Sequence, residues 1–203
     1  MDSSLFPTKG NLIRAKNTLA LSEQGFDLMD KKRNILVREM MGLMEQANEI
    51  QEKISETFAE AYLALQNANL TIGIHNVQDI AESIQEESRI EIMNRSLMGA
   101  EMPIIKRLDI QIEPQYGFAR TNVSLDVAFA NFTKVKGLII ELAEVENAIY
   151  RLANNIKRTQ KRANALQNIM IPKYEDVVGH MVNALEEKER EEFTRLKMIK
   201  KRS

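Results

Sequence analysis

The sequence predicts a mainly all-α fold: a long antiparallel two-helix coiled coil from N- and C-terminal helices, with a short β-hairpin and small helical segments at the far end. Of the 203 residues, 28% are charged and 5% aromatic, and tryptophan is absent. This composition is typical of long helices rather than of sheets. The four prolines leave two long stretches uninterrupted, and in both the apolar residues keep a heptad spacing. A sustained heptad repeat indicates a left-handed coiled coil.

The N-terminal helix is expected over residues 8–68, where one heptad seam continues for most of the stretch. Steps of three and four from Leu12 reach apolar residues at every position except Ser22, Arg33 and Thr57. Such spacing places one side chain per half-heptad on a single helix face. The seam consists of Leu12, Ala15, Leu19, Ser22, Phe26, Met29, Arg33, Leu36, Met40, Leu43, Ala47, Ile50, Ile54, Thr57, Ala61 and Ala64.

Residues 69–123 are expected to connect the two helices and to contain a β-hairpin near 88–113. Apolar residues alternate at Ile90 and Ile92 and again at 108, 110 and 112, with Gly99 and Pro103 between the two runs. Alternation on both sides of a glycine and a proline favours two strands and a turn. Pro114 then ends this segment.

The C-terminal helix is expected over residues 124–200, with an irregular stretch near Pro172, which cannot donate a helical hydrogen bond. Beyond Leu185 the repeat places Glu189 and Glu192 at seam positions before Leu196 and Ile199, so the apolar stripe has a charged gap. The second seam consists of Val135, Leu138, Leu142, Val145, Ile149, Leu152, Ile156, Thr159, Ala163, Leu166 and Met170.

Each seam is the natural partner of the other within one chain, which predicts a single elongated domain over residues 1–203. A homodimeric parallel coiled coil is the alternative that periodicity leaves open.

Several function classes find no support in the sequence. A formal net charge of −1 gives no reason to expect nucleic acid or an anionic membrane as the partner. No apolar run approaches the ~20 residues that a membrane span requires, so we expect no direct membrane insertion. There is no cysteine, there are only two histidines, and no phosphate-binding loop motif occurs. We therefore expect no catalytic residues, no cofactor and no metal, and a cytoplasmic location.

Charge is separated along the two predicted helices. The first helix is acidic in its middle, at Glu45, Glu49, Glu52 and Glu56, and the second has a basic cluster at Arg158, Lys161 and Arg162. Solubility of the helices and attraction to their dipoles explain part of this pattern. Separation into blocks also predicts different partners at different positions along the coiled coil.

Several motifs resemble the D subunit of the V-type, archaeal and vacuolar, rotary ATPases over essentially the whole chain. The most specific are Pro7-Thr8-Lys9, Lys32-Arg33, Asn164-Ala165-Leu166, Ile171-Pro172 and the stretch 189–196. Asn34, Ala163 and Gln167 depart from the residues that the family favours at those positions.

The resemblance implies a non-catalytic central-stalk rotor, peripheral to the membrane. Such a rotor couples ATP hydrolysis or synthesis in a hexamer of A and B subunits to rotation of a membrane ring and to proton or sodium transport. Its other implied partners are the small F subunit of the stalk and the C/d-type subunit that caps the membrane ring.

We expect two sets of residues to face these partners. The hexamer-facing set is Lys9, Arg158, Lys161, Arg162, Glu189, Arg190, Arg195 and Lys197. The set that faces the F subunit is Glu45, Glu49, Glu52, Glu56, Leu138, Glu141 and Val145.

Two other interpretations stay open at this point. A coiled-coil stalk of an export ATPase would also lie inside an ATPase ring, but it has no reason to carry a hairpin. A structural coiled-coil tether would have no rotary partner and would be expected to dimerise.

Overall fold

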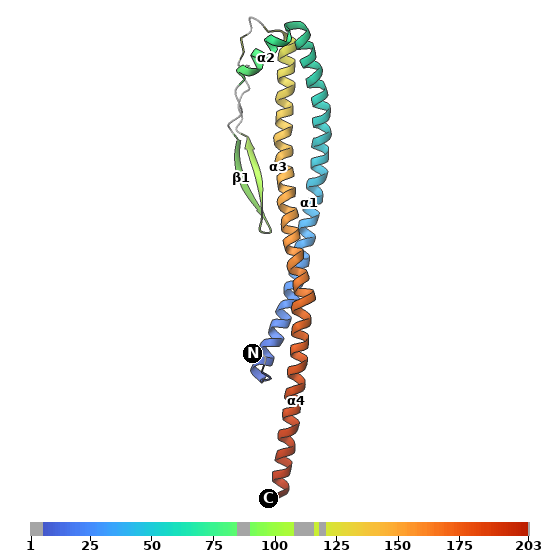
Figure 1. Ribbon diagram of the computed structural model, residues 1–203, viewed down its shortest axis with the longest axis vertical. Coiled ribbons are helices and arrows are strands. Elements are labelled where there is room, and N and C mark those ends of the chain that lie inside the picture. The colour runs from blue at the N-terminus through green and yellow to red at the C-terminus, as the bar shows by residue number, and fades with distance from the viewer. Residues whose placement is uncertain (1–5, 85–89, 108–115, 118–120, 203) are drawn as a thin grey trace. The chain divides into compact units, whose positions relative to one another are not determined.

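The computed structural model describes residues 6–84, 90–107, 116–117 and 121–202. It contains α1 (Lys9–Ile72), α2 (Ile74–Ser83), β1 (Ile90–Leu97), β2 (Ala100–Arg107), α3 (Val123–Ala165), a π-helical turn η3 (Leu166–Met170) and α4 (Ile171–Arg202) (Figure 1). The mainly helical fold, with two long helical segments and one short antiparallel sheet, is confirmed.

The chain divides into two compact units. Unit 1 comprises Met1–Ile35 and Ile156–Ser203, and unit 2 comprises Leu36–Asn155. Each unit therefore takes one part of α1 and one part of the second helical run. Every residue of the two predicted seams is buried or half-buried, which the heptad spacing anticipated.

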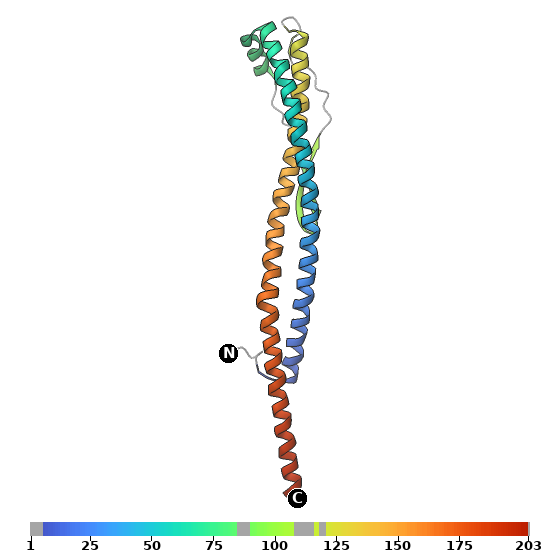
Figure 2. The same ribbon diagram turned by 90° about the vertical axis from the view of Figure 1, so that its right-hand side faces the viewer.

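In unit 2, α1 and α3 run antiparallel and side by side in both views (Figure 1 and Figure 2). Leu36 and Leu152 are fully buried, and Val135 is 2% exposed. The small seam residue Ala61 is also fully buried. Burying a leucine side chain stabilises a fold by about 1.5–3 kcal/mol, so the seam is the main stabilising feature of the unit.

A small cluster closes the end of unit 2 where α1 turns into α2. Gly73 has φ 93°, which a side chain would strain, and this bend lets α2 fold back. Val77 of α2 then packs with Ala68, Leu125 and Tyr116. The Tyr116 ring meets Phe129 edge-on, with centroids 5.6 Å apart. The cluster holds α2 against the start of α3.

The hairpin differs from its prediction in the position of the second strand. Leu97 pairs with Ala100 across the two-residue turn Met98-Gly99, where both residues have positive φ, as a type I′ turn requires. Gly99 lies in the turn as expected, but Pro103 lies within β2, opposite Asn94. The expected strand positions 108, 110 and 112 lie outside the described residues.

Pro103 is tolerated in β2 because its backbone nitrogen faces away from β1. The amide of Ile105, two residues on, donates to Oε2 of Glu144 on α3 at 3.0 Å, so this side of β2 faces α3. Alternate residues of a strand share a direction, so residue 103 would form no bond to β1 in any case.

The irregular stretch of unit 1 begins before Pro172. The π-helical turn η3 covers Leu166–Met170, and the Ile171 amide donates to the Leu166 carbonyl. Pro172 has no amide hydrogen for the Asn168 carbonyl, and a wider turn just before it accommodates that missing bond.

The Tyr116 hydroxyl makes the stability of the end cluster depend on pH in the alkaline range. It donates to Oδ1 of Asp126 at 2.8 Å, and burial, followed by this hydrogen bond and the Asp126 charge, raises the pKa of Tyr116 to about 12. An unfolded tyrosine titrates near pH 10. Tyr116 therefore binds its proton more tightly in the folded protein than in the unfolded protein.

We predict that Tyr116 adds no pH dependence to the free energy of unfolding below about pH 10, and that this free energy falls as the pH rises from about 10 to about 12. Urea unfolding at several alkaline pH values, compared between the protein and its Tyr116→Phe variant, measures this contribution. The variant should lose about 1 kcal/mol at neutral pH and show a shallower alkaline decline. An equal decline in both proteins would contradict the assignment.

Candidate functional surfaces

The first candidate surface is the C-terminal part of α4 in unit 1. The Lys9 ammonium at the start of α1 lies 2.9 Å from Oε1 of Glu189, with both side chains mostly exposed. Every residue from Glu186 to Lys201 is exposed, including Phe193 and Leu196. The expected return of the seam at Leu196 and Ile199 thus gives an uncovered stripe rather than a packed one.

The ion pair between Lys9 and Glu189 stabilises this end of unit 1 only weakly. The hydrogen bond and the charge of Glu189 raise the pKa of Lys9, so the ammonium stays protonated. Exposed pairs contribute between zero and about 1 kcal/mol. Arg190 and Glu186 form a second exposed pair at 3.7 Å on the same helix. The surface is therefore charged, hydrated and free to contact another protein.

The structure places the whole hexamer-facing set on the surface of unit 1. The basic cluster lies near the end of α3, with Arg158 and Arg162 one helical turn apart and Lys161 beside them. Glu189, Arg190, Arg195 and Lys197 lie beyond η3 on α4. Only Lys9 and Glu189 of this set are joined by an ion pair between described residues.

The second candidate surface lies in unit 2. The side chains of Glu45, Glu49, Glu52 and Glu56 on α1 and of Glu141 on α3 are exposed. Leu138 and Val145 are half-buried in the seam, so the glutamates carry most of what this surface offers to a partner.

The hairpin packs against α3, the helix that also carries Glu141, which sequence reasoning did not foresee. Glu144 accepts the Ile105 amide of β2, and Nη1 of Arg151 donates to the Glu101 carbonyl at 3.4 Å. Ala100 and Met102 are buried. The alternation that predicted the hairpin gives strands, but no local signal gives the face of α3 against which they pack.

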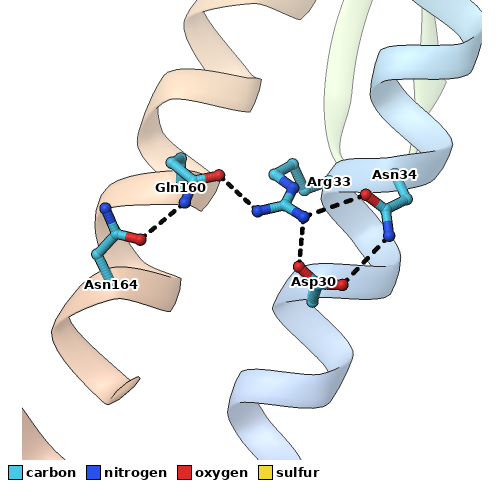
Figure 3. A network of polar contacts seen from close by, with 5 residues as sticks. All are labelled: Asp30, Arg33, Asn34, Gln160 and Asn164. Atoms are coloured by element: carbon cyan, nitrogen blue, oxygen red, sulfur yellow. Dashed lines mark hydrogen bonds and ion pairs between the residues drawn. The ribbon is translucent and has the colours of Figure 1, made fainter. Parts of the chain in front are cut away.

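Arg33 organises a polar layer across the seam of unit 1 (Figure 3). Its Nη1 donates to Oε1 of Gln160 at 2.8 Å, its Nη2 donates to Oδ1 of Asn34 at 3.3 Å, and the guanidinium forms an ion pair with Asp30. Asn34 donates to Asp30 at 3.2 Å, and Gln160 donates to Asn164 at 2.7 Å. A polar group in a coiled-coil seam sets the register of the two helices at some cost in stability.

Neither a metal-binding cluster nor a membrane-spanning helix occurs in the described part of the chain. Among its residues, no group of three or more histidine or carboxylate side chains could hold a metal ion. No helix within the described ranges is long and apolar enough to span a membrane.

Comparison with known proteins decides the family. The family model that describes the D subunit of ATP synthase matches residues 11–201. The chain belongs to the family of ATP synthase D subunits. The V-type ATP synthase D subunit of Thermotoga neapolitana is 43% identical over 199 residues, covering 98% of both chains. The A-type ATP synthase D subunit of Methanopyrus kandleri is 35% identical over 96% of this chain and 84% of its own.

Membership in the D-subunit family confirms the resemblance drawn from the sequence motifs. Two of those motifs contribute to the polar layer of unit 1, since Lys32-Arg33 supplies its guanidinium and Asn164-Ala165-Leu166 supplies its last acceptor. A third, Ile171-Pro172, follows η3. The protein is thus one of the subunits of a V/A-type ATP synthase complex.

The polar layer predicts an asymmetric response to substitution. Arg33→Met keeps the bulk of the side chain and removes the seam charge, so the free energy of unfolding should change by less than about 1 kcal/mol. Asp30→Ala leaves the guanidinium without its carboxylate and should lower stability by about 1 kcal/mol. Chemical denaturation of both variants measures the difference. A loss of several kcal/mol in Arg33→Met would contradict this prediction, because the seam charge would then stabilise the fold rather than cost stability.

Proposed function

We propose that the protein is the central-stalk rotor of its ATP synthase complex. In this role it is a non-catalytic axle that couples ATP hydrolysis or synthesis in the A/B hexamer to rotation of the membrane ring and to proton or sodium transport. One observation carries the proposal: in a chain of the D-subunit family, the seam stays covered up to Leu185, after which α4 continues with every side chain exposed to Lys201.

An exposed, charged helix suits a shaft that turns inside a ring. A large apolar contact with one wall would hold the shaft at one angle, whereas exposed ion pairs contribute under about 1 kcal/mol each. Glu186 to Glu192 and the basic residues that follow can therefore meet successive walls without a deep energy minimum. The exposed Phe193 and Leu196 add small apolar contacts to the same segment.

Two surfaces of unit 2 are proposed to bind the remaining partners, the F subunit and the C/d-type subunit. The acidic surface of α1, with Glu141 on α3, is proposed to bind the small F subunit of the stalk. At the end of the unit, Leu70, Ile74 and Val123 are exposed around the α1–α2 bend and the start of α3. Exposed apolar residues gathered at one place mark a contact surface, which suits the C/d-type subunit that caps the membrane ring.

The hairpin favours a rotor over the stalk of an export ATPase. An export stalk has no reason to carry two paired strands, and here β2 is anchored to α3 through Glu144 and Arg151. A structural tether stays the rival to exclude by experiment. Purification of the tagged protein from its own cells should recover a nucleotide-hydrolysing A/B hexamer with a small F-like subunit. Recovery of the protein alone, from cells that contain the ATPase, would favour the tether.

We predict that the basic cluster contributes to hexamer binding. The triple variant Arg158→Gln, Lys161→Gln, Arg162→Gln should raise the dissociation constant for the A/B hexamer by about tenfold, since rim charges steer and weakly stabilise association. Because all three side chains are exposed, thermal unfolding should be unchanged. Biolayer interferometry and ATPase assays of the reconstituted complex measure both effects.

A matched control comes from unit 2. The triple variant Arg38→Gln, Lys53→Gln, Lys134→Gln removes the same charge from three exposed positions and should leave hexamer binding unchanged. Equal affinities for both triple variants and the unaltered protein would remove the basic cluster from the interface.

We also predict that the acidic surface contributes to binding of the F subunit. Glu49→Lys with Glu56→Lys reverses two exposed charges two turns apart on α1 and should weaken this binding by about tenfold. Calorimetric titration with the purified F subunit measures the change. Glu187→Lys with Glu191→Lys, which reverses two exposed charges in unit 1, serves as the control. Intact binding by the Glu49 and Glu56 variant would exclude this surface.

A further inference from the structure

Strand β1 is an edge strand that no other described residue covers. The sheet has two strands, β2 lies on one side of β1, and β2 in turn contacts α3 (Figure 1). Seven of the eight β1 residues are exposed, with Ile92 68% and Met93 55% exposed. Edge strands are usually protected by charged side chains, proline, a bulge or a covering element. β1 has no proline, its continuous pairing with β2 leaves no bulge, and its two charged residues, Glu91 and Arg95, have opposite signs.

The direction of the β1 backbone groups follows from the contact between β2 and α3. Ile105 pairs with Ile92, and the Ile105 amide points to Glu144 rather than to β1. This pair is therefore a non-hydrogen-bonded pair, in which both residues turn their backbone groups outward. By alternation, Ile90, Ile92, Asn94 and Ser96 present amides and carbonyls at the open edge, and the intervening residues bond to β2.

The side chains of β1 are self-complementary about Met93. Glu91 and Arg95 are exposed, lie two residues on either side of Met93, and point to the same face of the sheet. Across the hairpin Glu91 faces Lys106, but Arg95 faces Met102 and has no opposite carboxylate there. A second β1 strand in antiparallel orientation would supply one.

We propose that two copies of the free protein pair through their β1 edges, antiparallel and centred on Met93, to form a four-stranded sheet. In this register Ile92 faces Asn94 of the second copy, and both present outward backbone groups that can bond. Glu91 of each copy faces Arg95 of the other in the closer, non-hydrogen-bonded pairs, where side chains interact most strongly.

Other registers form fewer backbone hydrogen bonds or fewer opposite-charge pairs between the two β1 strands. A shift by one residue would oppose outward with inward backbone groups and lose the ladder. Centring on Ile92 or Asn94 keeps the ladder, but it pairs neither Glu91 nor Arg95 with an opposite charge. Centring on Glu91 places two glutamates opposite each other, which is destabilising.

The sequence of β1 favours a second copy of the same strand as the partner at its open edge. A two-stranded sheet is marginally stable by itself, and this one is supported on the β2 side by α3; pairing through β1 would add two further strands on the other side. The twofold arrangement also satisfies both charges twice with no sequence requirement beyond β1. The pairing concerns the protein before it joins an assembly, so it stands or falls independently of the rotor proposal.

Charge reversal tests this pairing in the full-length protein by sedimentation equilibrium at up to about 100 µM. The unaltered protein should form a dimer. Glu91→Arg alone and Arg95→Glu alone each oppose like charges twice, and each should raise the dimer dissociation constant by about tenfold or more. An equimolar mixture of these two variants restores both opposite-charge pairs and should associate as a heterodimer.

A backbone variant tests the same edge without changing charge. The Asn94 amide faces outward opposite Pro103, so Asn94→Pro should keep the hairpin but prevent the dimer. Amide exchange at Met93 and Arg95, which bond to β2, checks that the hairpin persists.

Control variants Lys16→Glu and Glu23→Arg make equal charge changes at exposed positions of α1 and should leave the dimer unchanged. A monomer at about 100 µM would overturn the proposal. A dimer that neither the charge reversals nor Asn94→Pro affects would also overturn it, because association would then use another surface, such as a coiled-coil seam.

Discussion

Burial of the two heptad seams is the interaction on which the rest of the structure depends. α1 is 64 residues long, and a protein helix is held in place mainly by packing of its apolar face, here against a partner helix. Fully buried residues such as Leu36 and Leu152 supply large apolar contacts, and Ala61 lets the helices approach closely. The hairpin, the end cluster and the polar layer all attach to helices that the seams already hold in place.

The proposed function depends on where that interaction stops. A coupling shaft needs internal stiffness together with weak, distributed external contacts. Shifting a two-state catalytic site from one state to the other takes about 5.5 kcal/mol of differential binding, more than any single exposed ion pair can provide. Many small contacts along the exposed part of α4 and the basic cluster could supply it together. The polar layer around Arg33 would keep the register of the two helices constant under that load.

The heptad pattern was sufficient to predict the two long helices, their seams and the charged gap after Leu185, because burial follows helical spacing directly. It did not predict that Leu196 and Ile199, where the repeat resumes, would be exposed. The presence of a hairpin was predictable, since Gly99 suits a turn with positive φ. The position of the second strand was not: β2 begins at Ala100, and Pro103 was wrongly expected outside the strand. β2 tolerates Pro103 because the backbone nitrogen of Pro103 points toward α3 and away from β1. That direction is set by tertiary structure and not by local sequence. The Arg33 network was likewise hidden, because Gln160 and Asn164 come from a distant part of the chain.

The candidate surfaces show the same division. Exposed charges on α1 and α4 could be read from helical spacing, whereas the partners that meet them cannot be deduced from one chain. Leu138 and Val145 illustrate the limit, since their seam positions make them half-buried whatever binds nearby.

Rotation of the protein within its hexamer tests the central claim most directly. The chain contains no cysteine, so a single cysteine at the exposed position Glu60 of unit 2 would give one site for attaching a bead. With the A/B hexamer immobilised and ATP supplied, a rotor function predicts sustained rotation of the bead in one direction. ATP hydrolysis by an intact, bead-carrying complex without rotation of the bead would contradict it.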